Sequence, residues 1–162
     1  MAQHAWSNEQ IVALLKRIGD MLAILGEDRF RVQAYYRAAD SIATLGREVE
    51  EFWIAGLLRE IPGVGEALAG KLDELLGTGH LVYYERLQAQ VPSGVMELLT
   101  IPDVGPKTAR LLWQKAGLES VAEVKRAAEC GELRSLPGLG ARSESRILAG
   151  VQALLENGDQ SV

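Results

Sequence analysis

The sequence predicts an all-α protein, a helical bundle interrupted by three short turns of one kind. Apolar residues recur at spacings of three and four along most of the chain, as in Ile11, Leu14 and Ile18, and this period is typical of amphipathic helices. No segment alternates apolar and polar residues in the manner of a half-buried strand. A sequence of the form apolar-Pro-x-apolar-Gly occurs three times, with its prolines at positions 62, 102 and 137.

The first half of the chain divides into helices at recognisable start and stop signals. Ser7 and Gln10 have the spacing of a capping box, so the first helix begins there, and Gly26 ends it. Pro92 ends the last helix of this half, because proline cannot continue the backbone hydrogen bonds. Helices are predicted over residues 7–25, 29–45, 48–58, 66–76 and 81–90.

The second half of the chain contains the second and third turns. Residues 95–99 and 131–135 lead into these turns, and Pro106 suits the first position of a helix that ends at Gly117. Two more helices are predicted over residues 121–128 and 142–155, followed by a polar tail that frays. The predicted domains are residues 1–91 and 92–156, with residues 157–162 as the tail.

The totals describe an ordinary globular chain of 162 residues and exclude several classes of protein. The single cysteine, Cys130, excludes a disulfide framework and a cysteine-based zinc site, and His4 and His80 lack metal-ligand spacing. The sequence shows no signal-like start and no apolar run of about 20 residues. We therefore expect a cytoplasmic protein without a membrane partner.

The net charge of −5 argues against a protein that simply coats DNA, but the charge is unevenly distributed. Residues 101–146, around the second and third turns, hold eight basic and six acidic residues. Residues 61–100, around the first turn, hold two basic and five acidic residues. Affinity for nucleic acid should therefore be modest and should fall steeply as salt is raised.

The repeated turn has the physical properties of an anion site. Proline fixes φ and starts a tight turn, and a glycine within it can take positive φ. The helix that follows begins with free N–H groups and a partial positive charge, which together suit a phosphate. Such a turn reads no base, so it would hold a nucleic-acid backbone without regard to sequence. The alternative is that the three turns are structural corners between helices.

The turn, an apolar-Pro-Gly-apolar-Gly sequence leading into a helix, resembles the helix-hairpin-helix motif of DNA repair and replication proteins. The segments 30–39 and 71–79 extend the likeness to the amino-terminal region of family X DNA polymerases, closest to the bacterial branch, over residues 8–155. The resemblance implies a fold like the amino-terminal domain of DNA polymerase beta. It also implies a first domain that holds a 5′-phosphate at a DNA gap and a second that grips the primer side. A bacterial protein associated with the nucleoid is expected from the same resemblance.

The resemblance implies three groups of site residues. The first group would contact DNA phosphates through the hairpins: Gly63, Gly65 and Ala67; Gly105, Lys107, Thr108 and Arg110; and Gly138, Gly140, Arg142 and Ser143. The second group, the 5′-phosphate pocket, comprises Arg31, Tyr35, Arg59 and Lys71. The third would bind Na⁺ or K⁺ through the backbone carbonyls of Leu99, Ile101 and Val104, with Arg59, Ile61 and Val64 as counterparts in the first hairpin. No other cofactor is expected.

Neither polymerase nor nuclease activity is expected from this sequence. The family's palm domain would begin after the third hairpin, where a short tail remains, and the chain contains no Asp-x-Asp for paired metal ions. Lys71 occupies the position of the family's 5′-deoxyribose-phosphate lyase nucleophile, so lyase activity through a Schiff base is an alternative. Against it, Ala67 replaces a second family lysine, and Glu66 and Asp73 add negative charge. The competing interpretation of Lys71 is a solvated helix lysine.

Asp103 and the adjacent pair Tyr83 and Tyr84 also allow alternative interpretations. Asp103 replaces the glycine of the second hairpin, and its carboxylate would repel a phosphate unless it points away. Tyr83 and Tyr84 are interpreted as helix packing, with base stacking as the alternative.

Three hypotheses of function result. The first is a repair protein that binds the sugar–phosphate backbone of gapped, nicked or end-containing DNA without sequence specificity, beside a repair-protein partner. The second is the lyase, and the third is a protein–protein scaffold that no longer binds DNA. Whether the chain is complete or part of a longer polymerase is left open.

Overall fold

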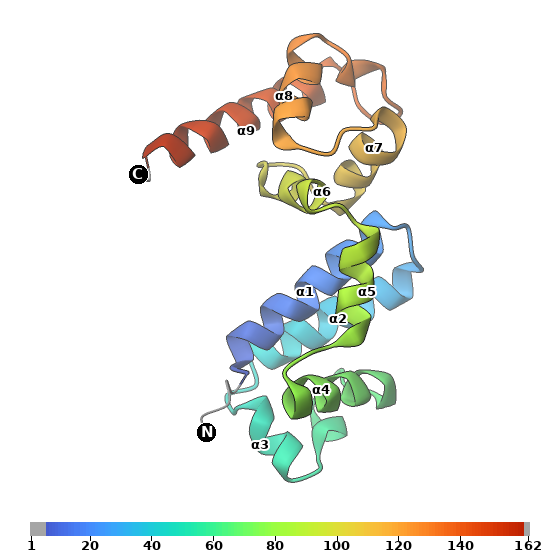
Figure 1. Cartoon of the computed structure of the whole chain (residues 1–162), viewed down its shortest axis with the longest axis vertical. Coiled ribbons are helices and arrows are strands. Elements are labelled where there is room, and N and C mark those ends of the chain that lie inside the picture. Colours follow the sequence, from blue (N-terminus) through green and yellow to red (C-terminus); the bar gives the residue numbers. More distant parts are fainter. Residues whose placement is uncertain (1–5, 161–162) are drawn as a thin grey trace. The chain divides into compact units, whose positions relative to one another are not determined.

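The computed structural model describes residues 6–160, with backbone alone for residues 158–160. All regular structure in this part of the chain is helical, which confirms the predicted all-α class (Figure 1). His4 and the end of the predicted tail, residues 161–162, lie outside the described residues. The elements are α1 (Asn8–Ile24), α2 (Arg29–Ala43), α3 (Val49–Ile54), the 3₁₀ turn η1 (Leu58–Glu60), α4 (Glu66–Thr78), α5 (Val82–Gln90), α6 (Ser93–Glu97), η2 (Leu98–Thr100), α7 (Pro106–Ala116), α8 (Val121–Glu129), η3 (Leu133–Ser135) and α9 (Ala141–Gln160).

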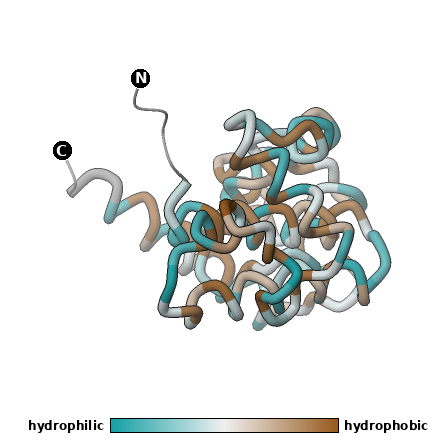
Figure 2. Tube along the Cα trace, turned by 90° about the horizontal axis from the view of Figure 1, so that it is seen from below, coloured by the Kyte–Doolittle hydropathy of each residue, from teal (hydrophilic) through white to brown (hydrophobic). Residues whose placement is uncertain are grey.

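The described residues form two units. The first comprises residues 6–22 and 27–89, and the second comprises residues 23–26 and 90–160. Hydrophobic and hydrophilic stretches are interspersed along the helices in Figure 2, as expected for amphipathic helices. Each unit buries its own set of apolar side chains. The largest fully buried ones are Ile11, Ile18, Met21, Leu22, Ile42, Ile61 and Leu72 in the first unit, and Ile24, Leu98, Ile101, Leu112 and Leu133 in the second.

The start of α1 has the capping box predicted from its sequence. The Gln10 N–H donates to Ser7 Oγ over 3.2 Å, and the Ser7 N–H donates to Gln10 Oε1 over 3.0 Å. Two of the N–H groups that a helix start leaves unpaired are satisfied in this way.

Within the first unit, α1 and α2 pack closely at Gly19. A Cβ atom at Gly19 would lie 2.6 Å from Tyr36 Cε1, so only glycine admits the Tyr36 ring there. The Tyr36 hydroxyl donates a hydrogen bond of 2.5 Å to Asp20 Oδ1, and burial raises the pKa of the Asp20 carboxyl. This contact fixes α2, which carries Arg31 and Tyr35, against α1.

Within the second unit, two glycines admit backbone at close range. A Cβ atom at Gly94 would lie 1.9 Å from the Glu119 carbonyl oxygen, and one at Gly150 would lie 3.0 Å from the Pro102 carbonyl oxygen. Gly150 therefore lets α9 pack against the turn that precedes α7.

Several element boundaries differ from the prediction, most of them by one or two residues, as at α2, which ends at Ala43 rather than residue 45, and three differences have a clear physical reason. The helix predicted over residues 48–58 ends at Ile54, because Gly56 adopts φ of 72° and Leu57 N–H closes the turn on the Phe52 carbonyl. The helix predicted to end at residue 76 continues to Thr78, with Gly79 as its left-handed cap. The tail predicted to fray over residues 157–162 is helical through Gln160, since each further residue adds a backbone hydrogen bond and no proline interrupts it.

Among the described residues, no helix is long and apolar enough to cross a membrane.

Candidate nucleic-acid interface

The three repeated turns are closed by the same backbone hydrogen bonds. In the first hairpin, Ile61 N–H donates to Leu58 O over 3.2 Å and Val64 N–H donates to Ile61 O over 3.0 Å. The second hairpin has the corresponding bonds at Ile101 and Val104, and the third has them at Leu136 and Leu139, with lengths of 3.0–3.1 Å. The helix that follows each turn begins at the residue after the turn's last glycine: Gly65, Gly105 or Gly140. The sequence repeat is therefore a structural repeat.

The third position of each turn is in the left-handed region. Gly63 and Gly138 both have φ of 83°, and Asp103 has φ of 72° at the corresponding place. Asp103 is the one non-glycine residue with positive φ among residues 6–160. Aspartate tolerates this region better than most residues, which explains how the second hairpin forms without a glycine at its third position.

Each hairpin presents unpaired backbone N–H groups at the start of a helix. The N–H groups of Gly65 and Ala67, of Lys107 and Thr108, and of Arg142 and Ser143 form no hydrogen bond within the described part of the chain. The glycines Gly63, Gly65, Gly105, Gly138 and Gly140 are all exposed. These groups are the donors that a phosphate oxygen accepts from at a helix start.

The basic side chains predicted beside the hairpins have different surroundings. Lys107 and Arg142 are exposed and form no ion pair within the described residues. Arg110 is engaged elsewhere in the second unit, where its Nη1 donates to the Ile24 carbonyl over 3.0 Å. Lys107 and Arg142 are therefore exposed cations in the first turn of the helix that follows a hairpin.

Replacement of Asp103 by asparagine should strengthen DNA binding. Asparagine keeps the left-handed turn and removes the charge. A carboxylate about 6 Å from a phosphate in water repels it by roughly 0.7 kcal/mol, which corresponds to about threefold in affinity. Fluorescence anisotropy at low salt should show this gain, and it should shrink as salt is raised. Glu129→Gln, an exposed acidic residue outside the hairpins, is the matched control; an equal gain in both variants would mean that Asp103 does not face the phosphate.

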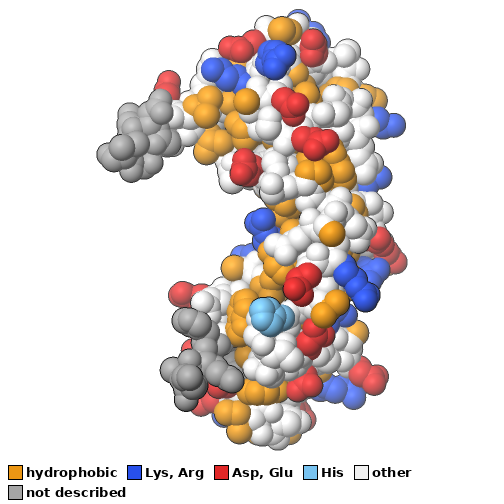
Figure 3. Space-filling model, in the orientation of Figure 1, with side chains coloured by type: hydrophobic (Ala, Val, Ile, Leu, Met, Phe, Trp, Pro, Cys, Tyr) orange, Lys and Arg blue, Asp and Glu red, His pale blue; other side chains and the backbone are white. Residues whose placement is uncertain are grey.

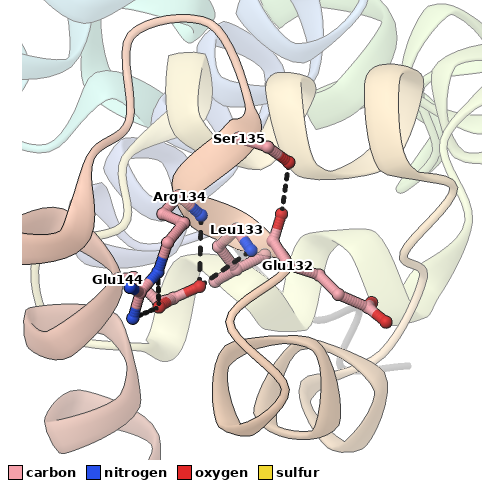
Figure 4. Close-up of polar contacts among 5 residues, drawn as sticks. All are labelled: Glu132, Leu133, Arg134, Ser135 and Glu144. Atoms are coloured by element: carbon pink, nitrogen blue, oxygen red, sulfur yellow. Dashed lines mark hydrogen bonds and ion pairs between the residues drawn. The ribbon is translucent and has the colours of Figure 1, made fainter.

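The third hairpin is held by a buried acidic residue, Glu144, on α9 (Figure 4). Glu144 Oε2 accepts from Leu133 N–H over 2.9 Å and from Arg134 N–H over 3.1 Å. Glu144 Oε1 pairs with the Arg134 guanidinium, at 2.9 Å from Nε and 2.8 Å from Nη2. The two N–H groups belong to η3, so the carboxylate joins the start of the hairpin to the helix after it.

The surroundings of Glu144 determine the direction in which the pKa of its carboxyl is shifted. Burial by itself would raise the pKa of the Glu144 carboxyl, but the hydrogen bonds and charge of Arg134 and the N–H of Leu133 outweigh burial and lower it. A carboxyl whose pKa is lower in the folded state stabilises that state above the pKa it has when unfolded.

The stability that Glu144 provides should therefore be complete above about pH 5 and should be lost as the pH falls through about 4 and below. Glu144→Gln should lower the melting temperature of the second unit by several degrees at pH 7, and the two proteins should converge near pH 3. Amide hydrogen exchange at Leu133 and Arg134 should accelerate in the variant at neutral pH. Glu129→Gln is the control, and an unchanged exchange rate in Glu144→Gln would contradict the assignment.

The first unit brings together three of the four residues predicted to form a 5′-phosphate pocket, around a fourth residue, Tyr83. Lys71 Nζ lies 4.7 Å and Arg31 Cζ lies 5.6 Å from the centroid of the Tyr83 ring. The Tyr35 ring stacks on Tyr83, with centroids 6.2 Å apart and an interplanar angle of 9°. We call Arg31, Tyr35, Lys71 and Tyr83 the Tyr83 cluster; its members come from α2, α4 and α5.

Electrostatics inside the Tyr83 cluster disfavour the charged form of the lysine. Burial and then the Arg31 guanidinium lower the pKa of Lys71, and the Glu74 carboxylate acts in the opposite direction. Burial, and then Tyr83, raise the pKa of Tyr35, so its hydroxyl stays protonated at neutral pH. Arg59, the fourth predicted pocket residue, lines a separate hollow of about 350 Å³ with Trp53, Gly70 and Asp73. Arg59 is therefore not part of the Tyr83 cluster.

The carbonyls predicted to bind a monovalent cation have free lone pairs. The Leu99 and Val104 carbonyls accept no hydrogen bond in the described residues, and the Ile101 carbonyl accepts one, from Val104 N–H. A carbonyl oxygen has two lone pairs, so all three can contribute to a hard cation such as Na⁺ or K⁺. No group of three or more His, Cys, Asp or Glu side chains suited to a metal ion occurs in residues 6–160.

Charge on the surface is mixed rather than uniformly basic. On the face drawn in Figure 3, lysine and arginine side chains are interspersed with aspartate and glutamate in each unit. This face therefore presents no uniformly basic surface.

Comparisons with known proteins agree with this geometry. A model of a helix-hairpin-helix domain matches residues 6–81, and a model of a SAM-like helix-hairpin-helix tandem matches residues 95–153. DNA polymerase/3′-5′ exonuclease PolX of Bacillus subtilis is 30% identical over 152 residues, which cover 94% of this chain. The chain is a helix-hairpin-helix protein related to the family X DNA polymerases.

The likeness covers a limited part of each relative. The matched residues amount to 26% of the Bacillus subtilis protein. DNA polymerase lambda of Rattus norvegicus is 31% identical over 60% of this chain and 16% of its own length. The Holliday junction branch migration complex subunit RuvA of an Acidovorax strain is 28% identical over 54% of this chain and 46% of its own length.

The sequence did not single out Glu144, and it did not show which side chains Tyr83 packs against. Glu144 lies in register with Ile147 and Val151, the apolar stripe of α9, and an acidic residue in such a stripe signals a buried carboxylate. Tyr83 lies four residues before the buried Leu87, so its ring faces the same side of α5. It does pack, as expected, but it packs on Lys71 and Arg31.

Proposed function

We propose that this chain binds DNA through its sugar–phosphate backbone, with preference for gapped, nicked or end-containing DNA, and that it acts in repair beside a catalytic partner. The observation that carries the proposal is the threefold repeat of one hydrogen-bonded turn, each followed by unpaired N–H groups at a helix start. Backbone donors of this kind recognise phosphate and no particular base. The relatives named above, two DNA polymerases and a Holliday junction protein, support a DNA partner.

The preference for a gap or an end has its own support. The hairpins belong to both units, and the Tyr83 cluster in the first unit adds two cations from different helices. Lys71 and Arg31 both lie against the Tyr83 ring, and Arg31 also forms an exposed ion pair with Glu27 over 3.6 Å. A terminal phosphate, which carries more charge than a phosphate inside a strand, would compete with Glu27 for the Arg31 guanidinium. A continuous duplex would engage the hairpins without offering such a group.

A binding titration tests the proposal. A short-gapped duplex with a 5′-phosphate, the same duplex without the phosphate and an intact duplex are each titrated at low and moderate salt, with anisotropy as the readout. The 5′-phosphorylated gap should bind most tightly, and its affinity should fall roughly tenfold or more as salt rises. Absence of binding at low salt would contradict the proposal and favour a scaffold for a protein partner.

A monovalent cation at the second hairpin belongs to the same proposal. The carbonyls of Leu99, Ile101 and Val104 would hold Na⁺ or K⁺, whose charge would favour an adjacent phosphate. Replacement of K⁺ by tetramethylammonium at constant ionic strength should therefore weaken binding by a few fold, because that ion is too large for a carbonyl cage. Equal affinities in the two salts would contradict this site.

A second function, removal of a 5′-deoxyribose phosphate, is favoured by the surroundings of Lys71. The neutral amine would add to the sugar aldehyde and lose water to form a C=N bond. Loss of a C2′ proton then breaks the C3′–O bond and leaves a 5′-phosphate on the downstream strand. The lowered pKa of Lys71 supports this role, because a larger fraction of the amine is neutral near pH 7. The Ala67 and Glu66 side chains supply no further cation, so the rate should be modest.

A further inference from the structure

Tyr83, in the first turn of α5, is the residue on which the Tyr83 cluster converges. The Lys71 ammonium, the Arg31 guanidinium and the Tyr35 ring all lie against its ring, and they come from two other helices. Its hydroxyl is buried and has no hydrogen-bond partner in the described residues. In the free protein, Tyr83 therefore contacts its neighbours through the packing of its ring and not through its hydroxyl.

Lys71 lies over this ring rather than beside a carboxylate. Its neighbour one turn along α4 is Glu74, and Glu74 Oε2 accepts the Val82 N–H over 2.8 Å at the start of α5. Within residues 6–160, Lys71 forms no ion pair. At the start of α5, the Val82 N–H is thus hydrogen-bonded to the Glu74 carboxylate, and the Tyr83 ring lies under the Lys71 amine.

We infer that Tyr83 is a positioning residue for Lys71, holding its amine beside Arg31 and away from a carboxylate, where the aldehyde carbon of a phosphate-anchored sugar would meet it. The inference rests on the proposed lyase function, because it specifies what orients the amine. A cation over an aromatic face is attracted by the ring quadrupole, which gives the side chain one preferred place. Arg31, which pairs with Glu27 in the free protein, would exchange that carboxylate for the phosphate of the same ligand.

The groups that face Lys71 define the expected effect of losing the ring. They are Arg31 and Tyr35 on α2, Glu74 on α4 and Tyr83 on α5. The ring itself favours the charged amine, but burial under it and proximity to Arg31 favour the neutral form, and these two effects dominate. Without the ring, the amine gains water and moves away from Arg31, so its pKa should rise.

The test compares Tyr83→Ala and Tyr83→Phe with Tyr84→Ala, a control at the adjacent tyrosine, which lines a different hollow with Trp6 and His80. The chain has five lysines, so reductive ¹³C-methylation gives a simple spectrum, in which Lys71→Arg identifies the Lys71 signal. Tyr83→Ala should raise the pKa of Lys71 by roughly half a unit or more. Tyr83→Phe and Tyr84→Ala should leave it unchanged. Tyr83→Leu, which keeps an apolar side chain, replaces Tyr83→Ala if that variant does not fold.

Borohydride trapping on a gapped duplex with a 5′-deoxyribose phosphate gives the second readout. The pH profile of trapping should move upward in Tyr83→Ala, with adduct formation at pH 7 slower by about threefold or more, and Tyr83→Phe should restore it. An unchanged pKa and an unchanged trapping profile in Tyr83→Ala would overturn the inference while leaving the lyase intact. A shifted Lys71 pKa with no adduct even in the wild type would support the positioning role and contradict the lyase.

Discussion

Reversal of two charges, Lys107→Glu with Arg142→Glu, should lower DNA affinity by roughly 100-fold at low salt. Each side chain follows the turn of a different hairpin, and each is exposed and without an ion pair in the described residues. In water, a unit charge about 5 Å from a phosphate contributes roughly 0.8 kcal/mol, and two reversals change four such units. The slope of log affinity against log salt should also fall by about two, because two phosphate contacts are lost. Anisotropy titrations at several salt concentrations measure both quantities.

The matched control for this experiment changes net charge by the same amount outside the hairpins. Lys115 and Arg126 are exposed residues of the second unit, on α7 and α8. Lys115→Glu with Arg126→Glu should lower affinity by no more than a few fold through the general field of the protein. If both double variants lose affinity equally, then net charge governs binding and the hairpins have no special part. If neither loses affinity, the scaffold hypothesis is favoured.

Lys71→Ala should abolish the borohydride-trapped adduct with a 5′-deoxyribose-phosphate end. The amine is the atom that forms the C=N bond, so no residual rate is expected from this site. Binding to the same DNA should change by less than about fivefold, since the hairpin contacts are kept. Denaturing gel analysis of the protein–DNA adduct, with parallel anisotropy, separates chemistry from binding.

Lys71→Arg is the informative control. Arginine keeps the positive charge beside Arg31 but is never neutral near pH 7, so adduct formation should be lost and binding kept. Lys125→Ala, a lysine on α8, should behave as the wild type in both measurements. Persistence of the adduct in Lys71→Ala at the wild-type rate would identify another amine as the nucleophile. Loss of binding in Lys71→Arg would instead indicate that the variant disturbs the Tyr83 cluster.

The amino-acid sequence by itself determined the class of fold and the places of the hairpins. Apolar periodicity, a capping box at Ser7 and Gln10, and three Pro-containing turns are local signals, and local signals decide where helices begin and end. All three turns form as predicted, including the one in which Asp103 takes the left-handed conformation that glycine adopts in the other two. The boundary prediction failed at Gly56 because it gave more weight to the apolar residues around this glycine than to the glycine itself. In the structure the helix ends at Ile54, just before Gly56.

Only the tertiary structure decided which side chains meet. Arg31, Lys71 and Tyr83 are separated by up to 52 positions in the chain, and the packing of α2, α4 and α5 brings them onto one ring. The same packing leaves Arg59 outside the cluster and engages Arg110 with a backbone carbonyl, although both were predicted to meet DNA. Charge and spacing along a sequence show that a cation is present. Its pKa and its freedom to bind depend on burial and on neighbours from other helices, and these exist only once the chain is folded.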